Sequence, residues 1–300
     1  MLNTSLKKIY GNLKIWRDNS VKTQQVNTYI KNDRKPWSLG YELYKKDFIH
    51  RAINDNSIMD KFRDRLKLPD KYGEFLDERV VEYPWLLSRL NNEKTKMLDA
   101  GSILNYDYIL NYEAINNKAV TIVTLEPENN CYWQKKVSYV FGDLRELDFR
   151  DNWFDEVVSL STIEHIGMDN SIYSDDEAFK EKQNLDFIKA VKEFKRVTKP
   201  EGKVYISVPY GKYTDFGWYQ QFNKEMIEQL ISAFAPSKLV ETYYCYEAGG
   251  WSISDKEHCQ DFAGFNIHET KYFNPNSTKD YDPDYAACSR AIAATTRNTG

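Results

Sequence analysis

From residue 96 onward, short apolar runs alternate with helical patterns, which is typical of a parallel sheet with helices between its strands. The predicted strands are Lys96–Ala100, Val120–Glu126, Ser138–Gly142, Phe154–Ser159, Lys203–Pro209, Leu239–Tyr246 and Ala286–Thr295. Between the fourth and fifth strands, apolar residues at helical spacing predict an amphipathic helix that ends at the turn Lys199-Pro-Glu-Gly. The apolar face of that helix consists of Leu185, Ile188, Val191, Phe194 and Val197. The pattern therefore predicts an α/β protein with a mostly parallel seven-stranded sheet.

The residues before the first predicted strand carry helical stripes. One stripe contains Tyr41, Tyr44, Phe48 and Ile49, and a second contains Val80, Tyr83, Leu87 and Leu90. We therefore divide the chain into a basic, helical cap segment at residues 1–92 and a sheet domain at residues 93–300. We expect the cap to pack over the carboxyl edge of the sheet, because its apolar stripes need a partner surface and active sites benefit from excluding water.

The composition is that of a globular protein, with 41% hydrophobic and 29% charged residues. The chain has 41 Lys and Arg against 45 Asp and Glu, and this net charge of -4 argues against nucleic acid as a partner. No apolar run approaches the roughly 20 residues of a membrane span, and the first residues lack a secretory signal. We therefore expect a cytoplasmic protein without a transmembrane segment; a homodimer stays open.

Two local features add little to this expectation. Residues 1–46 contain ten Lys and Arg against three acids, which usually indicates a solvated face, the alternative being a docking site for an anionic glycan, a lipid surface or a partner. The four cysteines, Cys131, Cys245, Cys259 and Cys288, lie far apart without a CxxC pair. We therefore predict reduced thiols and no metal site.

Four features occur in the order that a nucleotide-type cofactor site requires. The first is Leu98-Asp99-Ala100-Gly101-Ser102, where a glycine lets the backbone approach a ligand at the carboxyl edge of the sheet. The second is Glu126 at the end of the second strand, where a carboxylate accepts hydrogen bonds from two ribose hydroxyls; taken alone, it is as well explained by a solvated acid.

The third and fourth features follow the next two strands. Asp143, after Gly142, is placed to accept from an exocyclic amine, and Leu144 supplies an apolar face for a base. The buried strand from Phe154 leads into a polar cluster, Ser161-Thr-Ile-Glu164-His165-Ile166, which we expect to face a bound cofactor.

These motifs, with Phe-Lys-Arg-Val-Thr-Lys-Pro-Glu-Gly-Lys-Val at 194–204, resemble the class I, Rossmann-like S-adenosylmethionine-dependent methyltransferase superfamily over about residues 94–210. The resemblance implies S-adenosylmethionine as cofactor, with Asp99 and Gly101 at its methionine moiety, Glu126 at the ribose, and Asp143 and Leu144 at the adenine. Ala100, Ser102 and Ser161 complete the predicted cofactor set. Residues 37–90 also look like the cap of bacterial methyltransferase-like proteins associated with surface-polysaccharide biosynthesis.

One position departs from the family pattern. The first loop usually reads Gly-x-Gly, whereas here Gly101 is followed by Ser-Ile-Leu-Asn. We expect a side chain at the second glycine position either to crowd the cofactor, or to be compensated by polar groups of Ser102 and Asn105.

Methyl transfer to a hydroxyl requires alignment of the acceptor and removal of its proton. His165 is the predicted general base, because histidine titrates near working pH, and Glu164 is predicted to orient it; the alternative is a histidine that fixes the loop. His258, Asp255 and Asp261 are weaker candidates on a segment that we expect on the substrate side. The aromatic residues Tyr210, Tyr213, Phe216, Trp218 and Tyr219 follow the strand at Lys203–Pro209 and slightly favour a sugar acceptor.

Three function classes remain after this reasoning. A methyltransferase acting on a sugar, a glycan precursor or another small hydroxyl acceptor accounts for all four features. A non-catalytic cofactor-binding or assembly protein accounts for the missing glycine. An NAD-dependent oxidoreductase accounts for the sheet and Glu126, but that class usually has a fuller GxGxxG motif.

Overall fold

An eight-stranded sheet forms the centre of the computed structural model, which describes residues 20–174, 176–247, 249–271, 274 and 276–299. The strand order is β3-β2-β1-β4-β5-β10-β8-β9. The strands are β1 (Lys96–Ala100), β2 (Ala119–Thr124), β3 (Ser138–Phe141), β4 (Phe154–Leu160), β5 (Thr198–Pro209), β8 (Lys238–Glu247), β9 (Gly250–Ser254) and β10 (Ala291–Asn298). The pairs among β3, β2, β1, β4 and β5 are parallel, whereas β10 is antiparallel to both β5 and β8.

The mostly parallel α/β sheet is confirmed, but the predicted number of seven strands is wrong. The eighth strand is β9, which pairs antiparallel with β8 through Tyr246 and Trp251. Its sequence, Gly-Trp-Ser-Ile-Ser, is short and starts with glycine, so its pattern did not stand out from a loop.

Several strand ends also differ from the prediction. β5 begins at Thr198 and not at Lys203, so the predicted turn Lys199-Pro-Glu-Gly lies within the strand. β2 ends at Thr124, so Glu126 lies in the following loop and not in the strand. β10 begins at Ala291 and not at Ala286, because Ala286 and Ala287 are buried without being part of the ladder. Their burial gives this segment the apolar pattern of a strand although it is not part of the sheet.

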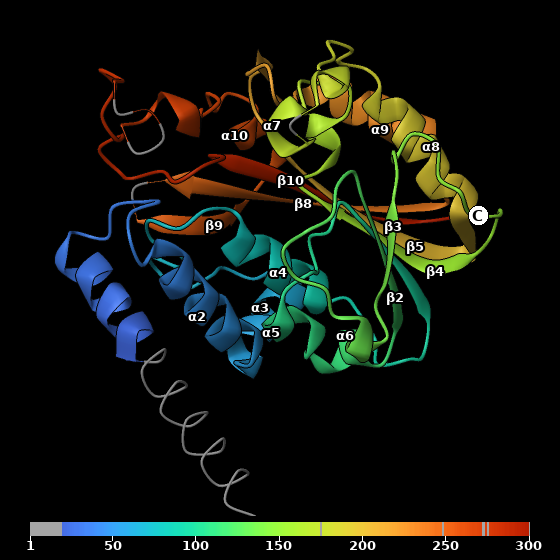
Figure 1. Cartoon of the computed structure of the whole chain (residues 1–300), viewed down its shortest axis with the longest axis horizontal. Coiled ribbons are helices and arrows are strands. Elements are labelled where there is room, and N and C mark those ends of the chain that lie inside the picture. The colour runs from blue at the N-terminus through green and yellow to red at the C-terminus, as the bar shows by residue number, and fades with distance from the viewer. Residues whose placement is uncertain (1–19, 175, 248, 272–273, 275, 300) are drawn as a thin grey trace, which may run out of the picture.

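Helices cover both faces of the sheet (Figure 1). One layer contains α2 (Tyr41–Ile53), α3 (Asn56–Asp64), α4 (Arg79–Leu87), α5 (Asp107–Leu110) and α6 (Glu113–Asn116). The other contains α8 (Phe187–Val197) and α9 (Lys224–Phe234), with α7 (Ser171–Ser174) and α10 (Lys256–Cys259) on the same side. A small hairpin, β6 (Thr214–Asp215) with β7 (Gln220–Gln221), follows β5.

Each layer has its own apolar core against the sheet. On the α8–α9 side, Val191 and Phe194 pack with Val157 of β4, which confirms the predicted amphipathic helix. Leu185 is an exception, because it precedes α8 and is exposed. On the other side, Trp85 of α4 contacts Tyr205 of β5 edge to face, with ring centroids 6.2 Å apart. The cap helices therefore share their core with the sheet, while the division of the chain at residue 92 stays a prediction.

The basic segment at the start of the chain is only partly described. Lys7, Lys8, Lys14 and Arg17 lie outside the described residues. Two of the remaining cations are used internally, because Lys45 pairs with Asp77 at 2.7 Å and Arg34 pairs with Glu74 at 2.6 Å. In the part of the chain that the structure describes, no helix is long and apolar enough to cross a membrane.

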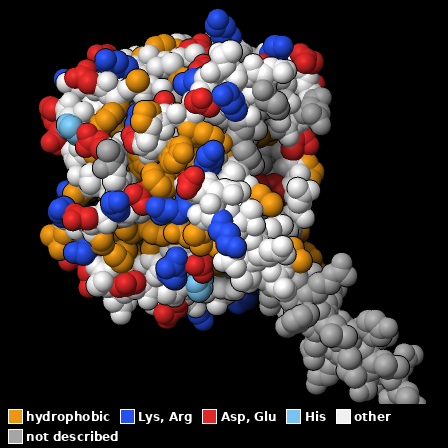
Figure 2. Space-filling view, turned by 90° about the vertical axis from the view of Figure 1, so that its left-hand side faces the viewer, with side chains coloured by type: hydrophobic (Ala, Val, Ile, Leu, Met, Phe, Trp, Pro, Cys, Tyr) orange, Lys and Arg blue, Asp and Glu red, His pale blue; other side chains and the backbone are white. Residues whose placement is uncertain are grey.

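Figure 2 views the molecule from the left-hand side of Figure 1. Hydrophobic side chains gather across the middle of this face, with Lys and Arg side chains among them. An exposed apolar area interspersed with cations is suited to contact with a ligand or partner.

Candidate active site

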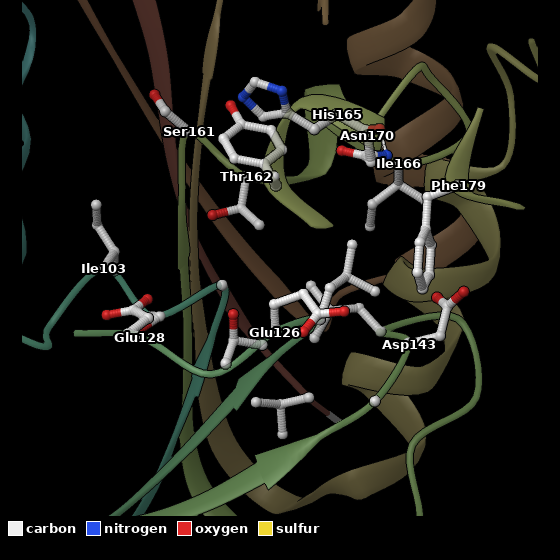
Figure 3. Close-up of a pocket in the computed structure, with 18 of the residues that line it drawn as sticks. Ile103, Glu126, Glu128, Asp143, Ser161, Thr162, His165, Ile166, Asn170 and Phe179 are labelled. Atoms are coloured by element: carbon white, nitrogen blue, oxygen red, sulfur yellow. Dashed lines mark hydrogen bonds between the residues drawn. The ribbon is translucent and has the colours of Figure 1, made fainter. Parts of the chain in front are cut away.

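A pocket of about 400 Å³, here called the edge pocket, lies where the parallel strands β1, β2, β3 and β4 end (Figure 3). Its wall includes residues from the loops after each of these strands: Gly101, Ser102, Ile103, Glu126, Glu128, Gly142, Asp143, Leu144, Ser161, Thr162, His165 and Ile166. In open α/β sheets, the crevice at the carboxyl ends of the strands is where ligands bind. The volume lies in the range of small-molecule sites.

The side chain of Asp99 stabilises the loop after β1. Its carboxylate accepts hydrogen bonds from the backbone N–H groups of Ile103 (3.1 Å) and Leu104 (2.7 Å). Burial raises the pKa of Asp99 to about 7, although these two hydrogen bonds act in the opposite direction. Asp99 and Ala100 are completely buried behind the pocket wall and do not line it. The prediction assigned both residues to the cofactor directly, whereas Asp99 shapes the loop that would contact it.

The backbone conformation and the close packing at residue 101 both require glycine. Its φ is 119°, a region that L side chains rarely adopt, and a Cβ here would lie 2.3 Å from Cγ2 of Thr162. Ser102 follows with φ 65°, and its buried hydroxyl has no hydrogen-bond partner among the described residues. The loop therefore presents tightly packed backbone and one unsatisfied hydroxyl to the edge pocket.

Ile103 occupies the position of the missing glycine. It lines the edge pocket, but its side chain is only 7% exposed and packs in the apolar core under the cap. Its backbone oxygen accepts a hydrogen bond from the hydroxyl of Tyr83 at 2.6 Å, which ties the loop to α4. Most of the isoleucine side chain is thus directed into the core and not into the pocket.

Glu126 and Asp143 lie on one side of the pocket, opposite Ser161 and His165 (Figure 3). No group among the described residues forms a hydrogen bond or ion pair with the Glu126 carboxylate. Asp143 accepts from Arg145, whose Nη2 lies 2.7 Å from Oδ2. Both the unpaired carboxylate of Glu126 and the Arg145-paired carboxylate of Asp143 can accept hydrogen bonds from a ligand bound between them.

The cap contributes a buried network to the pocket floor. The carboxylate of Glu82 in α4 accepts hydrogen bonds from the hydroxyls of Ser161 and Ser207, both at 2.6 Å, and pairs with Arg79 at 2.5 Å. The Glu82 side chain is fully buried. This network fixes α4 to the carboxyl ends of β4 and β5, and it places the guanidinium of Arg79 in the pocket wall.

A second pocket of about 490 Å³, here called the cap pocket, adjoins the first. Arg79, Tyr106, Ser161, His165 and Tyr173 line both pockets. The remaining wall combines cap residues with residues after β4, at the end of β5, in the turn of the β6–β7 hairpin and before β10: Trp37, Glu42, Leu43, Lys45, Lys46, Ile49, Asp77, Glu78, Tyr83, Tyr108, Glu164, Pro209, Trp218, Tyr219, Cys288 and Ser289. The cap therefore packs on one face of the sheet and also encloses space at its carboxyl edge.

His165 lies between the two pockets with one tautomer fixed. Its Nδ1 is 2.9 Å from the backbone oxygen of Trp218, and because a carbonyl only accepts, Nδ1 carries the proton. Nε2 is left with a free lone pair. Burial lowers the pKa of His165 to about 4, and the Trp218 carbonyl acts in the opposite direction. The imidazole is therefore neutral near pH 7.

The predicted orienting contact from Glu164 is absent. Its Oε1 is 3.9 Å from Nε2 of His165, beyond a hydrogen bond, and its Oε2 is buried without a partner among the described residues. Burial raises the pKa of Glu164 well above its usual range. The backbone oxygen of Trp218 orients the imidazole in its place.

Glu78 resembles Glu164 in its surroundings. It lines the cap pocket, accepts from the backbone N–H of Ser289 at 3.2 Å, and has its pKa raised to about 7 by burial and by the neighbouring Asp77 and Glu82. In the described part of the chain, neither Glu78 nor Glu164 has a Lys or Arg within 4.0 Å. The cap pocket therefore contains two carboxyl groups without a basic counterion.

Of the other candidates from the sequence, some line a pocket and some do not. Trp218 and Tyr219 line the cap pocket, whereas Tyr213 and Phe216 line neither pocket and Tyr210 is buried in the core. Asp255, His258 and Asp261 also line neither pocket. Sequence reasoning missed Arg79, Glu78 and Glu82, because acids and a cation beside an apolar stripe look like a solvated helix face.

Residues 111–206 match a protein family described as a methyltransferase domain. No curated protein matches the chain. Among solved structures, the chain is similar to a Burkholderia thailandensis 1,6-didemethyltoxoflavin N1-methyltransferase with bound 1,6-didemethyltoxoflavin and S-adenosylhomocysteine (15% identity, 69% of this chain and 72% of that one, TM-score 0.42). It is also similar to the YcgJ protein of Bacillus subtilis (15%, 73% and 98%, 0.43) and to PH0226 of Pyrococcus horikoshii (15%, 77% and 95%, 0.40).

These structural likenesses are remote, so the assignment depends on the family match. That match spans β2 through most of β5, which includes Glu126, Asp143 and the polar cluster after β4. Residues 111–206, less than half of the chain, are therefore similar to a methyltransferase domain.

Proposed function

We propose that this protein transfers a methyl group from S-adenosylmethionine to a small acceptor bound in the cap pocket. The observation that carries the proposal is the junction of the two pockets at His165, between the free carboxylate of Glu126 on one side and the aromatic wall with Trp218 on the other. A cofactor site that adjoins a second site is what direct transfer between two bound molecules requires.

The residues of the edge pocket fit the cofactor. Glu126 has no competing partner and would accept from the two ribose hydroxyls, while Asp143 and Leu144 would contact the adenine. The unsatisfied hydroxyl of Ser102 and the guanidinium of Arg79 lie where the charged amino-acid end would be held. The bound cofactor supplies an electrophilic methyl group on a sulfonium.

The protein's own contribution is alignment of the acceptor and proton removal. The lone pair on Nε2 of His165 would accept the proton of a hydroxyl acceptor as the methyl is transferred. The aromatic residues Trp218, Tyr219 and Tyr173 would hold the acceptor and exclude water. On this proposal the acceptor is a hydroxyl of a sugar or glycan precursor, consistent with the cap's resemblance to surface-polysaccharide proteins.

A specific observation favours a second acceptor class. Glu78 and Glu164 face the cap pocket without a basic partner, beside aromatic rings that attract cations. An amine or another positively charged acceptor would pair with these carboxyl groups and would favour their ionised forms. An ammonium group bound there would first lose one proton to Nε2 of His165, and the lone pair freed on its nitrogen would then accept the methyl group as the cofactor's S–C bond breaks.

Calorimetric titration of the purified protein with S-adenosylmethionine, S-adenosylhomocysteine and NAD tests the cofactor assignment. We expect binding of the first two and an increase of the melting temperature with ligand concentration. Absence of binding at millimolar concentration, or preference for NAD, would contradict the assignment.

Acceptor screening then separates the two classes. Glu164→Gln and Glu78→Gln should weaken binding of a cationic acceptor while leaving a neutral sugar acceptor within a few-fold of the unchanged protein. Tight cofactor binding without methylation of any hydroxyl or amine acceptor would favour a non-catalytic cofactor-binding protein.

A further inference from the structure

Three side chains with metal-binding atoms meet at the end of β8, outside both pockets. Cys245 and Glu247 belong to β8, and His258 belongs to α10. Their ligand atoms all lie within 4.8 Å of one another. Nε2 of His258 is 3.3 Å from Oε1 of Glu247, and Sγ of Cys245 is 3.7 Å from Oε2 of the same residue.

The two shorter separations, which reach the two different oxygens of Glu247, are close to the edges of a tetrahedral zinc site. Bonds of about 2.0 Å to nitrogen or oxygen and about 2.3 Å to sulfur give ligand-to-ligand edges of about 3.3 and 3.5 Å in a tetrahedron. Thiolate, imidazole and carboxylate are all ligands that Zn²⁺ accepts, and sulfur disfavours Mg²⁺ and Ca²⁺. The observed distances therefore leave room for one ion without a large change in the backbone.

The local fold explains how residues 13 positions apart come together. Cys245 and Glu247 are two residues apart on a strand, so their side chains lie on the same face. The side chain of Asp255 accepts a hydrogen bond from the backbone N–H of His258 at 2.7 Å, which caps α10 and positions the histidine. The absence of a CxxC motif concealed this arrangement in the sequence.

Two further residues contact the strand end that carries the cluster. The thiol of Cys259, next to His258 in sequence, donates a hydrogen bond to the backbone oxygen of Tyr244, with the two atoms 4.0 Å apart. Ser252 on β9 contacts Cys245 at 3.4 Å and lies on the buried side of the cluster.

We propose that Cys245, Glu247 and His258 form a Zn²⁺ site that joins α10 to the β8–β9 hairpin. Glu247 and His258 are about half exposed, so the ion has access from solvent and the fourth position is open to water. The site does not depend on the methyltransferase proposal, since none of its ligands lines either pocket.

The test uses the whole protein after removal of metals with a chelator. Zn²⁺ is titrated in competition with a chromophoric chelator, and Co²⁺ is followed by its absorption, since thiolate coordination gives a charge-transfer band. We expect one ion per chain. Cys245→Ser and His258→Gln should each weaken Zn²⁺ binding by more than the about 10–100-fold typical of outer-shell substitutions.

Matched controls are Cys131→Ser, at an exposed cysteine, and His50→Gln, at an exposed histidine of α2; both should retain the affinity of the unchanged protein. Circular dichroism checks the fold of each variant, and Glu247→Gln replaces Cys245→Ser if the latter does not fold. The proposal is overturned by absence of stoichiometric Zn²⁺ binding, by unchanged affinity in folded ligand variants, or by a Cys245–Cys259 disulfide found by thiol counting in the protein as purified.

Discussion

Nδ1 of His165 lies 2.9 Å from the backbone oxygen of Trp218, and this contact determines which imidazole nitrogen is available for chemistry. The proton on Nδ1 is directed at the carbonyl, so the free lone pair is on Nε2 of a side chain that lines both the edge pocket and the cap pocket. A loop carbonyl thus performs the orienting role that the sequence assigned to Glu164.

If Nε2 of His165 removes the acceptor proton, His165→Ala should lower the single-turnover rate by roughly 10²–10⁴. Cofactor affinity should change little, because the proton moves only during transfer. The paired measurement is the cofactor dissociation constant and the rate on the identified acceptor, with His50→Ala as control. Loss of cofactor affinity and stability together, with equal rates per bound enzyme, would mean that His165 only supports the loop.

The pH dependence follows from the pKa of His165, which is lowered to about 4. Only the neutral imidazole accepts a proton, so the rate should rise through about pH 4 and should show no histidine limb between pH 6 and 8. The free energy of unfolding should also increase with pH over this range. Below its ordinary pKa of about 6.5, this histidine binds a proton in the unfolded chain but not in the folded protein. This contribution is complete above pH 6.5 and declines toward pH 4. Urea unfolding of the protein and of His165→Gln at pH 5 and 7 measures it; an equal decline in both would rule it out.

Glu126→Ala should weaken cofactor binding by removing charge-assisted hydrogen bonds to the ribose, each worth about 1.5–3 kcal/mol. Glu126→Gln should lose less, since the amide oxygen still accepts one bond. Calorimetry measures both, and Glu146→Ala, at an exposed acid that does not line the pocket, is the control. An unchanged dissociation constant in folded Glu126→Ala would leave Glu126 as a solvated acid of the loop.

Truncation of Ile103 tests whether the missing glycine matters for binding. Because the side chain is mostly buried, Ile103→Ala should reduce stability by about 2–5 kcal/mol. Cofactor affinity should stay within a few-fold. Denaturant unfolding and calorimetry give the two quantities, and markedly tighter binding in the variant would show that the isoleucine crowds the cofactor.

Glu82→Ala should be strongly destabilising, because it leaves Arg79 without its partner and removes the acceptor for the hydroxyls of Ser161 and Ser207. Breaking a buried ion pair from one side typically costs about 3–5 kcal/mol. Glu228→Ala, at an exposed position of α9, should be nearly neutral. Equal melting temperatures for the two variants would show that the network contributes nothing to holding α4.

The sheet could be predicted because buried strands leave continuous apolar runs, as in Phe154–Leu160. The loops at their carboxyl ends could be predicted for the same reason, since their position follows from the strands. The role of Asp99 within its loop could not be predicted, because a carboxylate that accepts backbone N–H groups from its own loop has the same sequence pattern as one that contacts a ligand.

The cap pocket could not be predicted because its chemistry depends on contacts over long sequence separations. Glu82 pairs with hydroxyls of Ser161 and Ser207, and Glu78 accepts from the backbone of Ser289. No periodicity in a single sequence identifies such partners. The same reason applies to Cys245 and His258, whose proximity depends on where α10 docks on β8.

The position of β10 between β5 and β8 has a consequence for biosynthesis. When the ribosome has completed β8, the residues 291–298 that separate it from β5 have not yet been made, so both strands expose unpaired hydrogen-bonding edges on the nascent chain. Insertion of β10 forms non-local ladders on both sides at once, which favours slow completion of this half of the sheet. Until then the emerging polypeptide carries two edges open to aggregation, and a chaperone that shields extended edges would increase the yield of folded protein.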